Sequence, residues 1–222
     1  PGGRWRATGE RDGAVRLWSV DDADFEPIVL QHGDKMMNLA FTADGNRLVT
    51  ASWDMTVRVW DVRRLPQLPD PIVLQGHTAG LRALAISPDN RWLFTSAYDA
   101  LNLLWDLNDP TREPVTIEGH EVWADDARFT PDSKRLVTIS PYSTVRVYDI
   151  TRPADPVVLT GQAGRIVTLD ISDDGRWLVT AGDDPEVYLW DLSDLEVPPV
   201  HLSSPSIDPS VHNHFNFDTD IS

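Results

Sequence analysis

Histidine and acidic side chains are the residues of this sequence whose types could bind a metal ion or transfer a proton. Of the six histidines, His212 and His214 stand one residue apart, so on a strand both imidazoles would point to the same face. A zinc site needs further ligands, and no third ligand is evident. Three acid pairs also occur: Asp21-Asp22, Asp125-Asp126 and Asp183-Asp184. These pairs lack the ligand spacing of a calcium loop, so we interpret them as solvated loop charges.

Other signatures of catalysis are missing from the sequence. It contains neither a glycine-rich phosphate loop nor a serine within a Gly-x-Ser-x-Gly turn. Cysteine is absent, which excludes disulfides and thiolate metal sites. We therefore predict no catalytic residue, no metal and no cofactor, and we expect that the protein is not an enzyme.

The overall charge limits the class of partner. The formal net charge is -16, which opposes nucleic acid, because phosphate binding depends on Lys and Arg. A basic partner is favoured by the same field. No apolar run approaches the roughly 18 residues of a membrane span, and no signal peptide is recognisable, so we expect a cytoplasmic protein without membrane contact. The chain begins Pro-Gly-Gly without an initiator Met, which suggests a piece of something longer.

The sequence repeats itself with a nearly constant period. Five similar segments end in an aromatic residue at positions 18, 60, 105, 148 and 190, with spacings of 42, 45, 43 and 42. A threonine stands ten residues before each aromatic, and His32, His77, His120 and Gln162 stand 28 residues before the last four. Several independent offsets held over five units indicate a structural repeat.

Each unit is predicted to form four short strands. In the second unit these are residues 38–41, 47–52, 56–61 and 72–75, which alternate in polarity and are separated by turn residues. No segment has a helical period, so the fold class is all-β. Units of about 40–45 residues have the size of a propeller blade, which buries its faces only by stacking on neighbours. We predict one domain over 1–222, with units at 1–42, 43–87, 88–130, 131–172 and 173–222.

Two recurring dipeptides give this repeat a family resemblance. Trp-Asp occurs at 60–61, 105–106 and 190–191, with variants at 18–19 and 148–149, and Gly-His occurs at 76–77 and 119–120, with a variant at 31–32. The pattern resembles the WD40 repeat family over essentially the whole chain. This resemblance implies a β-propeller of four-stranded antiparallel blades. The strong repetition and the Pro-rich connectors resemble bacterial WD40 arrays, which are often fused to signalling kinases or NTPases.

In that family a buried hydrogen-bond network links the histidine, a strand hydroxyl, a turn aspartate and the strand aromatic. The resemblance places the following residues in it: His32, Asp54, Trp60, His77, Asp99, Trp105, His120, Tyr148, Asp184, Trp190, His212, Asp12 and Trp18. The hydroxyl is left open between the threonine ten residues and the serine eight residues before the aromatic, as in Thr50 and Ser52. Tyr142 and Gln162 break the pattern, so we expect units four and five to depend on packing.

The two ends of the sequence are complementary. His212 stands ten residues before Ser222, which predicts a first strand over 217–221, while residues 4–30 supply a second, third and fourth strand. The units could therefore close as a five-bladed ring. Alternatively they form an arc of a larger ring, commonly seven-bladed in this family, and we favour the arc.

The resemblance also implies where a partner would bind. Members usually bind peptides or proteins on the ring face, with loops between the second and third strands and with the starts of first strands. The corresponding candidates are Arg11, Trp53, Tyr98, Lys35, Trp123, Arg165 and Phe215. Trp, Tyr and Arg dominate interface hot spots, although these rings could instead pack on neighbouring blades. Trp5, Trp92 and Trp177 share a second-strand position and are expected between blades.

Three functions remain open at this point. The favoured one is a scaffold that binds a protein or peptide, other domains of the same polypeptide included, within a larger signalling or regulatory protein. The second is a propeller enzyme or metal-dependent hydrolase, which would need carboxylates and histidines to converge on the central channel. The third is a purely structural repeat array.

Overall fold

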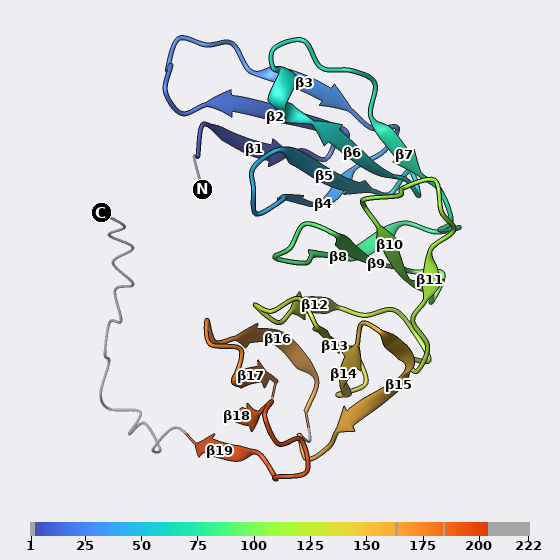
Figure 1. Cartoon of the computed structure of the whole chain (residues 1–222), viewed down its shortest axis with the longest axis vertical. Helices are drawn as coiled ribbons and strands as arrows, with labels where there is room; N and C mark the ends of the chain where they lie inside the picture. The colour runs from blue at the N-terminus through green and yellow to red at the C-terminus, as the bar shows by residue number, and fades with distance from the viewer. Residues whose placement is uncertain (1–2, 163, 184, 204–222) are drawn as a thin grey trace.

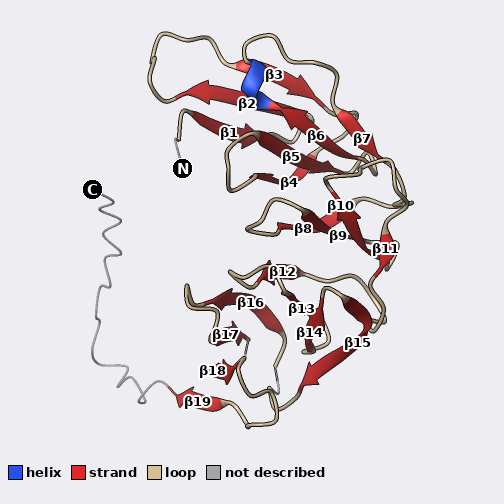
Figure 2. Ribbon diagram, viewed as in Figure 1, coloured by secondary structure: helices blue, strands red, loops and turns tan. Residues whose placement is uncertain are grey.

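The prediction of an all-β fold is confirmed by the computed structural model. The structure describes residues 3–162, 164–183 and 185–203, and within them the helical content is one short 3-10 segment, η1 (Val62–Arg64). Everything else is strands, turns and connections (Figure 2). The strands form five antiparallel sheets, each made of strands that are consecutive in the sequence. We call these sheets blades 1 to 5.

The strand bounds follow the chain from blade to blade. Blade 1 contains β1 (Trp5–Gly9), β2 (Ala14–Ser19) and β3 (Ile28–Gln31); blade 2 contains β4 (Met36–Phe41), β5 (Arg47–Ser52), β6 (Val57–Asp61) and β7 (Ile72–Leu74). Blade 3 contains β8 (Leu81–Ile86), β9 (Trp92–Ala97), β10 (Asn102–Asp106) and β11 (Val115–Thr116). Blade 4 contains β12 (Asp126–Phe129), β13 (Arg135–Ile139), β14 (Val145–Asp149) and β15 (Arg152–Leu159). Blade 5 contains β16 (Ile166–Ile171), β17 (Trp177–Gly182), β18 (Glu186–Asp191) and β19 (Val200–Ser203).

The turn after the first strand of each complete blade has the same construction. A residue with a side-chain hydroxyl follows the strand and opens the turn. The third residue after it has a left-handed backbone, with φ of 68°, 63°, 59° and 71° at Gly45, Asn90, Ser133 and Gly175. The hydroxyl that opens the turn donates to an aspartate two residues later, for example from Thr42 Oγ1 to Asp44 Oδ1 at 2.6 Å. Asp44 Oδ1 in turn accepts from the backbone N–H of residue 46 at 3.0 Å. The turn chemistry therefore fixes the register of each first hairpin.

Hydrophobic packing joins each blade to the next. Adjacent residues of β9 point to opposite faces, so Leu93 belongs to a cluster with blade 2 and Phe94 to a cluster with blade 4. Four such clusters occur, one between each pair of consecutive blades. The aromatic of the repeat lies in each of them, always from the later blade of the pair: Trp60, Trp105, Tyr148 and Trp190. The recurring aromatics thus occupy equivalent environments, as expected of blades that stack around an axis.

The five blades follow an open arc (Figure 1). The inner strands β4, β8, β12 and β16 contact one another in that order, and blades 1 and 5 stand at opposite ends. In the described residues the sheets do not close into a ring, which agrees with the favoured arc. Blade 1 has three described strands; the strand predicted over 217–221 lies outside the described residues.

The three second-strand tryptophans do not behave alike. Trp5 and Trp92 pack partly against inter-blade clusters, as expected. Trp177 belongs to none of the four clusters, although the guanidinium of Arg176 lies 4.7 Å from its ring centre, much as that of Arg91 lies 4.6 Å from the ring centre of Trp92. The reason is that the second-strand tryptophan of a blade faces the following blade, and no described strand follows blade 5.

Candidate binding face and the network beneath it

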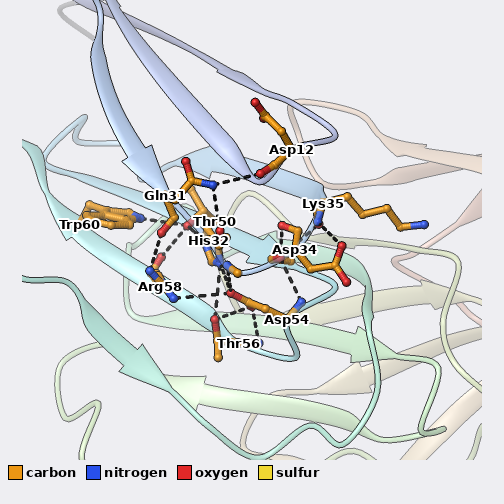
Figure 3. Close-up of polar contacts among 12 residues, drawn as sticks. Asp12, Gln31, His32, Asp34, Lys35, Thr50, Asp54, Thr56, Arg58 and Trp60 are labelled. Carbon is orange, nitrogen blue, oxygen red and sulfur yellow. Dashed lines mark hydrogen bonds and ion pairs between the residues drawn. The ribbon is translucent and has the colours of Figure 1, made fainter.

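Blade 2 holds a continuous chain of hydrogen bonds between side chains (Figure 3). Trp60 Nε1, on β6, donates to Thr50 Oγ1, on β5, at 2.9 Å. Thr50 Oγ1 lies 2.8 Å from His32 Nε2, and His32 Nδ1 lies 3.0 Å from Asp54 Oδ2 in the β5–β6 turn. Ser52 is not in this chain, since its hydroxyl donates to the carbonyl of residue 34 at 2.8 Å. The structure therefore selects the threonine for the hydroxyl position.

Blade 3 repeats the arrangement with its own residues. Trp105 Nε1 donates to Thr95 Oγ1 at 2.8 Å, and Thr95 Oγ1 lies 2.9 Å from His77 Nε2. His77 Nδ1 lies 3.2 Å from Asp99 Oδ2. In both blades the threonine and histidine are buried. The histidine in each blade therefore donates from Nδ1 to the aspartate and accepts at Nε2 from the threonine, so every proton in the chain has an acceptor.

Burial decides the protonation of these histidines. It lowers the pKa of His32 and of His77, outweighing the nearby aspartate charges. Partial burial opposes ionisation of Asp54, but hydrogen bonds from Thr56 and from the Gly33 N–H outweigh it and lower the pKa of the carboxyl to about 2. At neutral pH the network thus contains neutral imidazoles and an ionised carboxylate.

Blades 4 and 5 depart from this pattern but keep hydrogen bonds. In blade 4, His120 Nε2 lies 2.6 Å from Thr138 Oγ1, and His120 Nδ1 lies 2.7 Å from Nη1 of Arg146. Tyr148 replaces the tryptophan and donates to the Glu118 carbonyl at 2.9 Å. In blade 5, Trp190 donates to Thr180 at 3.0 Å, and Thr180 donates to Gln162 at 2.7 Å. The expectation that these blades rely on packing was therefore too simple.

The remaining predicted network residues lie at the two ends of the chain. Trp18 Nε1 donates to Thr8 at 3.2 Å, and Asp12 accepts from the N–H of residue 14 at 3.0 Å. Both side chains are exposed, because blade 1 has no earlier blade against it among the described residues. Asp184 and His212 lie outside the described residues.

Two kinds of loop meet above this network at one edge of the blades. The N–H of Trp53, in the β5–β6 turn, donates to the carbonyl of Lys35, just before β4, at 3.0 Å. In blade 3 the N–H of Tyr98 donates to the carbonyl of Gly80 at 3.1 Å. The turn between second and third strands is thus tied to the start of the first strand. Residues from both loops therefore share one face.

Three aromatic residues form a row across this face. The ring centres of Trp53 and Tyr98 are 5.6 Å apart, and those of Tyr98 and Trp123 are 4.9 Å apart. At one end, Nζ of Lys35 lies 3.6 Å from the Trp53 ring centre. Tyr98 is 40% exposed and the two tryptophans are half-buried. We call Trp53, Tyr98 and Trp123 the aromatic strip; it runs from blade 2 to the loop that enters blade 4.

An ion-pair cluster continues the strip toward blade 5. Trp123 Nε1 donates to Asp125 Oδ1 at 3.1 Å. Asp125 also pairs with Arg82 of β8 at 3.0 Å and with Arg165, before β16, at 3.1 Å. The Asp125 side chain is only 5% exposed. One carboxylate therefore links three blades, and the two guanidinium groups leave a surplus of positive charge at this end.

A comparison with known protein families agrees with the repeat. The family model described as WD domain, G-beta repeat matches residues 26–61, 71–106 and 156–191. Each match ends on one of the Trp-Asp pairs of the sequence. The chain belongs to the WD40 repeat family.

Curated relatives carry the same kind of repeat within longer proteins. The chain is 28% identical over 190 residues to pre-mRNA-processing factor 19 homolog 2 of Arabidopsis thaliana, covering 85% of this chain and 36% of the relative. It is 28% identical over 216 residues to guanine nucleotide-binding protein subunit beta of Oryza sativa subsp. japonica, covering 89% and 57%. It is 23% identical over 216 residues to apoptotic protease-activating factor 1 of Rattus norvegicus, covering 97% and 17%. This WD40 chain therefore spans only part of the length of these relatives.

The strip gathers most, but not all, of the candidates inferred from the WD40 resemblance. Lys35, Trp53, Tyr98, Trp123 and Arg165 lie along it or at its ends. Arg11 is exposed in the β1–β2 turn of blade 1, and Phe215 lies outside the described residues.

Sequence reasoning missed two residues and one packing contact. The interpretation of Asp125 as a solvated loop charge was wrong, since it is buried between arginines, and Arg82 was not considered. Gly80 is the missed contact: a Cβ there would lie 2.8 Å from the Trp53 ring. A small residue at this register therefore lets Trp53 pack closely over the loop.

The structure offers no metal cluster in the part that it describes. Among those residues, no three histidine, aspartate or glutamate side chains gather in a way that could hold an ion. His212 and His214 lie outside that part. Nor does any described helix have the length and apolarity that a membrane crossing requires.

The lowered histidine pKa values predict that stability falls in mild acid. In the unfolded chain the histidines take up protons near pH 6.5. In the folded chain burial lowers the pKa of His32, His77 and His120, so these imidazoles stay neutral. For His120 the charge of Arg146 adds to the effect of burial, and the pKa falls to about 3. Stability should therefore be full above pH 6.5 and decline toward pH 3, with each histidine contributing up to about 1.4 kcal/mol per pH unit.

Urea unfolding between pH 7.5 and 4.5 measures this decline. The His120→Gln variant copies the glutamine that blade 5 uses at the same register and cannot take up a proton. We expect it to show a shallower pH slope than the parent chain, by about one proton. Equal slopes for the two chains would contradict the assignment of His120 as a buried neutral histidine.

Proposed function

We propose that this WD40 chain is a protein-interaction scaffold whose docking surface is the aromatic strip. The observation that carries the proposal is the continuity of the strip. Trp53, Tyr98 and Trp123 come from different blades, yet their rings touch in one row with Tyr98 exposed. Neighbouring rings hold one another in place, so a partner would lose little side-chain entropy in binding them. Aromatic rings with adjacent arginines are the residue types that dominate binding energy.

The partner that this surface fits is a protein or peptide. A row of rings offers apolar area, and its cations stand only at the two ends, Lys35 at one and Arg82 and Arg165 at the other, so they cannot track a phosphate backbone along the strip. The net charge of -16 favours a partner of basic character at long range. The name of one relative, guanine nucleotide-binding protein subunit beta, describes a subunit of an assembly. We propose that this chain works in the same manner, as part of a larger regulatory protein.

Removing both tryptophans of the strip should abolish partner binding. We expect the variant Trp53→Ala/Trp123→Ala to lose affinity by about 100-fold or more, since each hot-spot residue is worth about 2 kcal/mol or more. Proteins captured from the source extract by the parent chain and by the variant would be compared by quantitative mass spectrometry. The affinity of the recovered partner would then be measured by calorimetry.

A matched control removes two exposed apolar side chains far from the strip. Val158 and Val200 lie on the outer strands β15 and β19 and are 43% and 52% exposed. The variant Val158→Ala/Val200→Ala should retain the partners. If the parent chain and the strip variant capture the same proteins with equal affinity, the strip is not the docking surface. If the parent chain captures no specific protein, the purely structural array is the better account.

A further inference from the structure

Three arginines occupy the same register in the third segment of the repeat, and they differ in their partners. Arg16 forms an ion pair with Glu10 in blade 1. Arg58 Nη2 lies 3.5 Å from Asp54 Oδ2 in blade 2. Among the described residues, no carboxylate lies within ion-pair distance of Arg146 in blade 4. Glu118 and Glu121 stand on either side of His120 in the sequence. Both are exposed, and neither forms an ion pair with Arg146. Within the described part of the chain, Arg146 is therefore a cation without a counter-charge.

The missing charge has an identifiable cause. Tyr142 stands in blade 4 where blade 2 has Asp54, and its side chain is turned to solvent with 68% exposed. In place of a carboxylate, Arg146 Nη1 contacts His120 Nδ1 at 2.7 Å and Thr144 Oγ1 at 2.7 Å. Because a guanidinium can only donate, His120 must accept at Nδ1 and donate from Nε2. The hydrogen-bond chain of blade 4 thus runs in the opposite direction to that of blade 2.

Neutral acceptors do not satisfy this guanidinium fully. Arg146 Nε is buried and has no hydrogen-bond partner in the described structure; Nε of Arg58 is buried and unpartnered as well, so the two arginines differ in the carboxylate beside them and not at Nε. Leaving a buried donor of a charged group unpaired is costly, and more costly than for a neutral group. The hydroxyls of Thr144 and Ser140 lie 2.6 Å apart at the same turn. They add neutral hydrogen-bonding groups beside the cation.

We propose that Arg146 binds a carboxylate that a protein partner supplies from an aspartate or glutamate side chain, and we call this binding position the seat. Because His120 and Thr144 take the two hydrogens of Arg146 Nη1, the carboxylate would be received by Nη2, the group that Arg58 turns toward Asp54 in blade 2, in a charge-assisted hydrogen bond. Blade 2 shows that a carboxylate fits this register, because Asp54 lies there against Arg58 and His32. Gly119 keeps the guanidinium closely packed, since a Cβ there would lie 3.0 Å from Arg146 Nε. The partner carboxylate would complete the network that Tyr142 leaves open.

The seat lies on the same edge of the blades as the aromatic strip. Tyr142 is in the β13–β14 turn, which is the equivalent in blade 4 of the β9–β10 turn that carries Tyr98. A partner seated on the strip could therefore present an acidic residue to Arg146, and in this respect the inference rests on the proposed function. The net negative charge of the chain attracts a basic partner at long range. At contact, the seat needs only a single carboxylate from that partner.

A small-molecule titration tests the seat without the natural partner. The probe is N-acetylglutamate N-methylamide, and its neutral control is the glutamine analogue. Resonances of the Arg146 Nε–H and of the His120 ring would be followed by NMR. We expect a saturable shift with the glutamate probe and none with the glutamine analogue. The Arg58→Gln variant, which alters an arginine already paired with a carboxylate, should leave the shift unchanged.

The variant Tyr142→Asp supplies the missing carboxylate from within the chain. We expect it to abolish the probe-induced shift and to raise the melting temperature by about 2–4 °C, the gain expected from about 1 kcal/mol in a chain of this size. A shift that persists in this variant, or that the glutamine analogue also produces, would overturn the proposal. So would tighter binding of a phosphoserine analogue, which would reassign the seat to phosphate. None of these outcomes changes the capture experiment, so the seat and the strip fail or succeed separately.

Discussion

Replacing Asp54 by alanine is expected to lower the free energy of unfolding by about 3 kcal/mol. The Asp54 carboxylate accepts from His32 Nδ1, from the Gly33 N–H at 2.8 Å and from the Thr56 N–H at 3.0 Å. It also faces Arg58 at 3.5 Å. Alanine would leave these donors without an acceptor, and the unpaired donors, among them the buried His32 ring and the partly buried Arg58 guanidinium, carry most of the cost. Urea unfolding at pH 7.5 measures the change.

Two further variants separate the role of the network from a general loss of charge. Asp21, which pairs with Arg4 at 3.7 Å, has a side chain that is 70% exposed, so Asp21→Ala should cost well under about 1 kcal/mol. Asp54→Asn keeps an acceptor oxygen but removes the negative charge, so we expect an intermediate loss. An unfolding curve of Asp54→Ala that overlays the parent curve would show that the hydrogen-bonded chain does not stabilise the fold.

The sequence was sufficient to predict those features that recur with the period of the repeat. Trp60, Trp105 and Trp190 could be placed in one register because each lies in the same kind of inter-blade cluster. A constant spatial environment selects the same residue type at the same interval, and that interval is visible in a single chain. The all-β class and the strand positions follow from the same periodicity.

Features that depend on one particular pair of distant residues could not be predicted in this way. Thr50 and Ser52 lie two positions apart on β5 and so point to the same side of the sheet; only the distance to His32 distinguishes them. Asp125 was misjudged because Arg82 and Arg165 are 43 and 40 residues away, on other blades. The reversed hydrogen bonding at His120 depends on a contact with Arg146, which is 26 residues away; the sequence showed Tyr142 at the aspartate position but not which group would replace the carboxylate.

The packing between blades should be as important to stability as the polar network, and Phe94 is the residue that tests it. Phe94 is fully buried on β9, within the cluster that joins Leu104 of blade 3 to Ala127 and Tyr148 of blade 4. We expect Phe94→Ala to cost about 3–5 kcal/mol, from lost burial and from the cavity that remains.

The location of the damage matters more than its size, because it distinguishes stacked blades from independent ones. Hydrogen exchange would follow β9 and β10 in blade 3 together with β13 and β14 in blade 4. The control is Val73→Ala, which truncates a side chain on β7 that is 42% exposed and should change little. If blades support one another, amides of both blades lose protection when Phe94 is removed, since neither sheet alone can bury that face. Loss confined to blade 3 would mean that each sheet holds its own core. In that case the aromatic strip, which depends on the relative position of three blades, would have no rigid base.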